Sequence, residues 1–95
     1  MVVGTGQITF RLFGVSSLKA KRKIVKSTLR RIDNTFNVSV AEVDLNDSHH
    51  FAKIGFAVVG NDAARVNSIL DKIIGFTDDL GLAMITDSQI EIVHY

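Results

Sequence analysis

Ninety-five residues with 46% hydrophobic content and a net charge of +1 are enough for one domain with a packed core, and exclude a disordered chain. The absence of cysteine excludes disulfides, thiolate metal sites and cysteine nucleophiles. Met1 to Gly6 lacks the features of a secretory signal, and no apolar run approaches the ~18 residues that span a bilayer, so we expect a soluble cytoplasmic protein without membrane contact.

The first predicted elements are a strand and a helix. The strand has apolar residues at every second position: Ile8, Phe10 and Leu12. Gly14 ends this pattern, and Ser16 or Ser17 offers an N-cap side chain. The following residues have an apolar stripe at helical spacing: Leu18, Val25, Leu29 and Ile32. We expect this helix to stop at Asn34.

The predicted first helix concentrates positive charge. Lys19 to Asp33 contains seven basic residues and one acidic residue, a net charge of +6, whereas the four basic and nine acidic residues elsewhere give −5. At about 100° per residue, most of these cations turn to one flank. The residues that we expect to contact nucleic-acid phosphates are Lys19, Lys23, Lys26 and Arg30, with Arg22 beside the apolar stripe.

A second interpretation of this helix needs no partner. If the two helices lie side by side, the acidic residues Asp71, Asp78 and Asp79 of the second could neutralise the first. Exposed pairs of this kind contribute only ~0–1 kcal/mol, and a charged helix face is also an ordinary means of solubility. Ion pairs with those three residues would favour this interpretation, and free cations would favour phosphate contact.

The remaining elements complete a β-α-β-β-α-β order. Two β-rich segments come next, residues 37–45 and Phe51 to Val59, with Glu42 and Asp44 on the first as charges that protect a sheet edge. A second helix begins at Asn61-Asp62 and ends at Gly81. Its apolar face is broad: Val66, Ile69, Leu70, Ile73, Phe76, Thr77 and Leu80. A closing strand contains Ile90 and Ile92.

This order predicts one α+β domain over residues 1–95, a ferredoxin-like sandwich. Both helices would cover one face of a four-stranded antiparallel sheet, with the first and third strands in its centre. The third strand is apolar on both faces, since Gly55, Ala57 and Val59 alternate with core residues. This pattern predicts a homodimer through the open sheet face. The alternative is that these small residues are exposed singly in a monomer.

Two stretches of the sequence resemble the bacterial YlxP-like family, a small domain of unknown function. They are Ser17-Leu18-Lys19-Ala20-Lys21-Arg22 and Phe36-Asn37-Val38-Ser39-Val40-Ala41-Glu42-Val43. The resemblance runs along the whole chain and includes Val58-Val59-Gly60-Asn61-Asp62, where the second helix starts. It implies a ferredoxin-like fold and a gene neighbourhood often shared with translation and ribosome-maturation factors. It implies no known activity or site.

Two motifs are similar to those of proteins with other functions. Gly55-Phe56-Ala57-Val58-Val59 is superficially similar to the RRM signature, but Val58 replaces a stacking aromatic, so we expect Phe56 in the core. Arg11-Leu12-Phe13-Gly14-Val15 is similar to the start of the acylphosphatase phosphate loop. Leu18 stands where that family has its phosphate-binding arginine, which leaves no cation to stabilise the transition state. We therefore expect no enzymatic activity.

No metal or cofactor site is predicted. His49 and His50 are adjacent, so on an extended backbone they point to opposite sides and are better explained as exposed loop residues. The leading hypothesis is a non-enzymatic accessory protein that contacts RNA, with ribosomal RNA or the ribosome as partner, through the first helix. The alternative is a protein-interaction or homodimerisation module without nucleic-acid binding.

Overall fold

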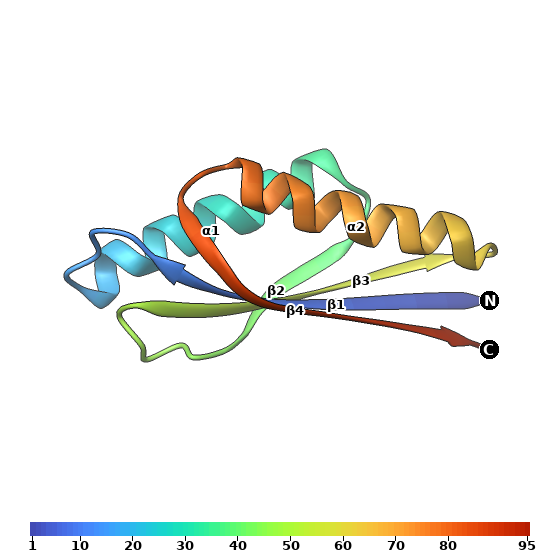
Figure 1. Ribbon diagram of the computed structural model, residues 1–95, viewed down its shortest axis with the longest axis horizontal. Coiled ribbons are helices and arrows are strands. Elements are labelled where there is room, and N and C mark those ends of the chain that lie inside the picture. The colour runs from blue at the N-terminus through green and yellow to red at the C-terminus, as the bar shows by residue number, and fades with distance from the viewer.

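The computed structural model describes residues 1–95 and contains six elements in the predicted order (Figure 1). They are β1 (Val2–Leu12), α1 (Leu18–Thr35), β2 (Ser39–Asp44), β3 (Phe51–Gly60), α2 (Ala63–Asp79) and β4 (Ala83–His94). The chain ends meet where the Met1 amino group donates a hydrogen bond to the Tyr95 carbonyl at 3.0 Å. No helix is both long enough and apolar enough to cross a membrane.

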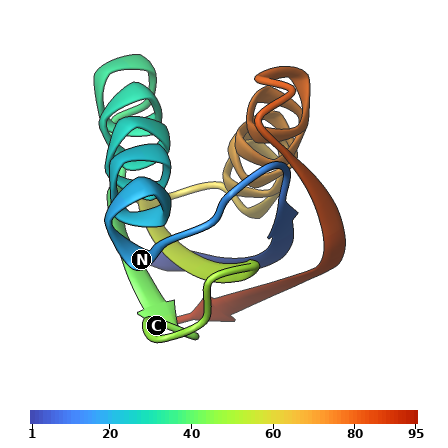
Figure 2. The same cartoon turned by 90° about the vertical axis from the view of Figure 1, so that its left-hand side faces the viewer.

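The four strands form one antiparallel sheet in the order β2-β3-β1-β4. This order places β1 and β3 in the centre, as predicted, and leaves β2 and β4 at the edges. The two helices lie next to each other on one face of the sheet (Figures 1 and 2). The α+β ferredoxin-like architecture expected from the sequence is therefore confirmed.

The core lies between the sheet and the helices. Ile8 on β1, Ile54 on β3 and Leu70 on α2 have no exposed surface. The rings of Phe36 and Phe76 meet edge-on, with centroids 5.5 Å apart, and join the end of α1 to α2. Phe56 is 4% exposed and points into this core, so its side chain is not on the open face where RRM domains stack bases.

β1 begins at Val2, several residues before the alternation that predicted it. The inward positions of this early part are Gly4 and Gly6, which have no side chain to show a pattern. A β-carbon on Gly4 would lie 2.4 Å from Val66 Cγ1, and one on Gly6 would lie 2.3 Å from a ring carbon of Phe56. Side chains from α2 and β3 occupy the space, so the strand is buried although its own residues are small.

The helix ends agree with the predicted caps. Ser17 caps α1, and its hydroxyl accepts a hydrogen bond from the Ala20 backbone N–H at 3.1 Å. Asp62 caps α2 in the same way for Ala64, at 3.1 Å. Gly81 has a φ of +67°, the left-handed conformation that ends a helix at low cost for glycine. α1 continues one residue past the predicted stop.

Candidate nucleic-acid interface

All five predicted phosphate-contacting residues are exposed on α1. They are Lys19, Arg22, Lys23, Lys26 and Arg30. The one ion pair of the molecule joins Lys21 to Glu42, so none of these five cations has a carboxylate partner. The ion pairs of the alternative interpretation, between the cations of α1 and Asp71, Asp78 or Asp79, are absent.

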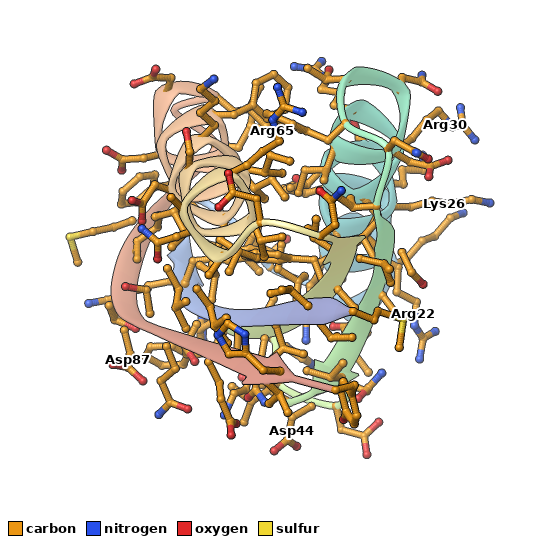
Figure 3. The ribbon with its side chains drawn as sticks, turned by 90° about the vertical axis from the view of Figure 1, so that its right-hand side faces the viewer. Arg22, Lys26, Arg30, Asp44, Arg65 and Asp87 are labelled. Atoms are coloured by element: carbon orange, nitrogen blue, oxygen red, sulfur yellow. The ribbon has the colours of Figure 1, made fainter.

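The direction of the basic flank explains why these cations are free. Figure 3 shows Arg22, Lys26 and Arg30 pointing away from α2, on the side of α1 that lies over the edge of the sheet at β2. These three residues are four positions apart, so they form one row with a spacing of about 6 Å along the helix axis. The acidic residues of α2 lie on another element and do not approach this row. The flank is therefore positive from Lys19 to Arg30, and the exposed Asp33 lies at its end.

Lys21 is buried, unlike the five exposed cations described above, and the sequence pattern did not predict this difference. It is 1% exposed, and the buried face of α1 consists of Lys21, Val25, Thr28 and Ile32. The predicted apolar residues Leu18 and Leu29 are only half-buried at the margin of this face. The Lys21 ammonium donates a hydrogen bond to the Leu45 carbonyl and lies 3.4 Å from Glu42 Oε2. A long aliphatic stem allows a lysine to occupy such a place when its charge is paired.

Glu42 pairs with Lys21, whereas the sequence predicted that its charge would protect the edge of the sheet. β2 is an edge strand, as expected, and the Asp44 side chain is exposed. Glu42 instead faces α1, where its Oε1 accepts a hydrogen bond from Asn46 at 3.3 Å and its buried Oε2 faces Lys21. The pairing of β2 with β3 shifts between Glu42 and Asp44, which bends the strand at this edge.

An open groove runs beside the basic row, between α1 and β2. It has a volume of about 560 Å³. Its lining residues are Lys26, Leu29, Arg30 and Asp33 from α1, Val38 just before β2, and Ser39 and Val40 from β2. No motif pointed to this groove. In the structure the groove is marked by Leu29, Val38 and Val40, which pack against the core but remain half-buried.

The open face of the sheet has an apolar part over β2 and β3. Val59 and Val43 are 67% and 51% exposed. A hollow of about 250 Å³ is lined by Val43, Gly55 and Ala57 among others, and a β-carbon on Gly55 would lie 2.9 Å from Val43 Cγ1. Lys53 on β3 and Asp87 on β4 are opposite Thr9 of β1 in the register, so charge borders this part of the face.

The loops with other candidate residues do not form a compact site. Arg11, Gly14 and His50 line an open hollow of about 510 Å³ at the start of α1, where Gly14 has a φ of +62°. The rings of His49 and His50 have centroids 6.3 Å apart, and both residues are exposed. No group of three or more His, Cys, Asp or Glu residues is arranged to hold a metal ion.

A β-α-β-β-α-β sandwich with both helices on one sheet face defines a ferredoxin-like α+β domain. In this domain the first helix, α1, is the basic one. The chain belongs to the family described as "Protein of unknown function (DUF503)", which matches residues 3–90. The uncharacterized protein YlxP of Bacillus subtilis (strain 168) is 29% identical over 77 residues, which cover 81% of this chain and 84% of that protein. The resemblance to YlxP-like proteins is thereby confirmed.

Solved structures share the fold. The crystal structure of a putative chlorite dismutase matches 97% of this chain with a TM-score of 0.53 and 15% identity, and this chain spans 44% of that protein's length. A dimeric ferredoxin-like protein of unknown function from Thermobifida fusca matches 98% of this chain, over 92% of its own length, with a TM-score of 0.42 and 13% identity. At 15% identity, the likeness to the putative chlorite dismutase concerns the fold alone.

Proposed function

We propose that this protein is a non-enzymatic accessory protein of the cytoplasm that contacts RNA, on the ribosome, through the outer flank of α1. The observation that carries the proposal is a row of exposed cations with no acidic partner in the molecule. The phosphate contacts are assigned to Lys19, Lys23, Lys26 and Arg30, with Arg22 at the margin of these four residues. The gene neighbourhood implied by the YlxP-like resemblance supports the ribosome as the place of contact.

The chemistry of this contact is electrostatic. Each ammonium or guanidinium group that approaches a phosphate releases condensed counterions, which gives an affinity that depends strongly on salt. Phosphate contacts position a protein on RNA but carry no sequence information by themselves. The flank accordingly accounts for binding and orientation, and any base preference needs other groups.

A salt titration tests the proposal directly. With five phosphate contacts, the plot of log affinity against log salt concentration should have a slope of about −3.5 for single-stranded RNA and about −4.5 for a duplex. Sedimentation with ribosomal subunits at increasing ionic strength measures retention, and fluorescence anisotropy with RNA oligonucleotides measures the slope. A salt-independent signal, or no retention at low salt, would reject RNA contact by this flank.

A second function, homodimerisation, is supported by a different surface. The exposed Val43 lines the hollow at Gly55, and the exposed Val59 lies two positions beyond Ala57 on β3, so a second copy of the chain could cover this apolar area. We expect light scattering at high micromolar concentration to give about twice the 10.4 kDa mass of the chain. Val43→Lys with Val59→Lys should restore the monomer mass, whereas Asn67→Lys on α2 should not. A monomeric wild-type protein contradicts this proposal and leaves RNA contact unaffected.

A further inference from the structure

The groove between α1 and β2 combines three kinds of surface in one place. Lys26 and Arg30 supply positive charge on its α1 wall. The half-buried side chains of Leu29, Val38 and Val40 supply an apolar floor. Asp33, the only acidic residue of α1, is exposed at the same wall and has no ion pair. A surface that binds only phosphates needs the first of these and neither of the other two.

An apolar floor next to cations suits an unstacked nucleobase. Proteins stack the unstacked bases of single strands on aromatic side chains and hold flipped bases between aromatic or apolar ones, while cations track the backbone. In an A-form duplex the bases are stacked and paired, so none of them is free to enter the groove. The volume of about 560 Å³ leaves room for a base at the floor. The floor therefore favours a single strand over a duplex.

The spacing of the cations agrees with a strand that runs along α1. Arg22, Lys26 and Arg30 project from the same side of the helix (Figure 3). They repeat every four residues, at about 6 Å of helix rise, which is close to the separation of successive phosphates on one RNA strand. When the phosphates of an RNA strand lie along this row, a base of that RNA strand can turn toward β2 and enter the groove.

Asp33 places a carboxylate at the groove, and a carboxylate distinguishes bases by their hydrogen-bond donors. An ionised carboxylate only accepts hydrogen bonds, and its two oxygens match two parallel donors. Among the four RNA bases, guanine presents such a pair on its Watson–Crick edge, from N1–H and the exocyclic amino group. Adenine presents a single amino donor beside an acceptor nitrogen, which a carboxylate would repel.

We infer that the RNA contacted by α1 is single-stranded and that one guanine base lies in the groove, on Leu29, Val38 and Val40, with its Watson–Crick edge toward Asp33. This inference rests on the proposed function and adds the class of RNA and the base that it reads. Asp33 is here the specificity-determining residue, and Lys26 and Arg30 hold the phosphates on either side of the base.

The test uses fluorescence anisotropy with the full chain. The probes are a ten-nucleotide oligouridine with one central guanine, the same oligonucleotide with a central adenine, and a blunt-ended RNA duplex of two complementary strands. We expect the guanine probe to bind about fivefold tighter or more than the other two, as for a bidentate base contact. Asp33→Asn should remove this preference without weakening the adenine probe, whereas Asp71→Asn, an exposed carboxylate on α2, should change neither affinity.

The floor is tested separately. Leu29→Ser should reduce the affinity for the guanine probe severalfold and leave that for the duplex unchanged, because only an inserted base meets the floor. Equal binding of all three probes, unaffected by Asp33→Asn and Leu29→Ser, would overturn the inference while RNA contact by α1 stands. Displacement of the guanine probe by a polyglutamate peptide in a Leu29-dependent manner would overturn it in favour of an acidic protein partner. Failure of every RNA to bind would reject the proposed function as well.

Discussion

Reversal of two neighbouring cations, Lys26→Glu with Arg30→Glu, is expected to weaken RNA binding by about 25-fold or more at ~0.1 M salt. On single strands each phosphate contact contributes about 0.7 to the salt slope, so each lost contact removes roughly a factor of five at this concentration. The introduced carboxylates add repulsion to this loss. The salt slope should become shallower by about 1.4 in the same titration.

The chain offers a matched control for this variant. Arg65 and Lys72 are exposed cations on α2, so Arg65→Glu with Lys72→Glu makes the same change in net charge on the other helix. We expect this control to reduce binding far less, since it removes no phosphate contact. Both variants should retain the free energy of unfolding to within ~0.5 kcal/mol for each exposed site. Equal losses of binding in the two variants would mean that net charge, and not the flank of α1, governs retention.

Removal of the buried charge of α1, in Lys21→Met, is expected to reduce the free energy of unfolding by about 2–4 kcal/mol. Methionine keeps most of the volume of the side chain but leaves Glu42 Oε2 buried with no cation beside it. It also removes the hydrogen bond that joins α1 to the Leu45 carbonyl. The partial exposure of the Glu42 side chain, 18%, keeps the expected loss below that of a completely buried pair. Urea unfolding followed by circular dichroism measures this loss.

Two further variants decide whether the ion pair causes this effect. Lys21→Met with Glu42→Leu removes both charges and should recover most of the lost stability, because no unpaired carboxylate remains. Lys23→Met, on the exposed flank of the same helix, should change the free energy of unfolding by less than ~0.5 kcal/mol. Additive losses in the double variant, or a loss for Lys23→Met as large as for Lys21→Met, would contradict the pairing of Lys21 with Glu42 as the cause.

Periodic side-chain patterns were sufficient to predict the fold. The alternation of Ile8, Phe10 and Leu12 and the broad apolar face of α2 each matched a buried surface of the structure. Part of β1 escaped prediction because Gly4 and Gly6 occupy its inward positions. The apolar surface at these positions comes from Phe56, Val66 and Leu70. These residues belong to other elements, so the periodicity of β1 alone does not reveal that this part of the strand is buried.

The candidate site was predicted in part. The five cations assigned to phosphate contact lie on one helix, and the helical repeat determines which of them share a flank. The groove beside them was not predicted, because Asp33 and Leu29 meet Val38 and Val40 only when β2 lies against α1. The sequence pattern of each segment does not show which residues of α1 lie beside which residues of β2.

The sequence by itself determined the order and type of the elements and the concentration of charge on α1, since these follow from local periodicity and from counting. Tertiary structure decided which cations are free. Lys21 lies within the same basic run as Lys19 and Lys23, yet only it reaches the Leu45 carbonyl and Glu42, which packing of the helix on the sheet brings to it. Burial and ion pairing depend on residues distant in the chain, so charges that look alike in sequence differ in the folded protein.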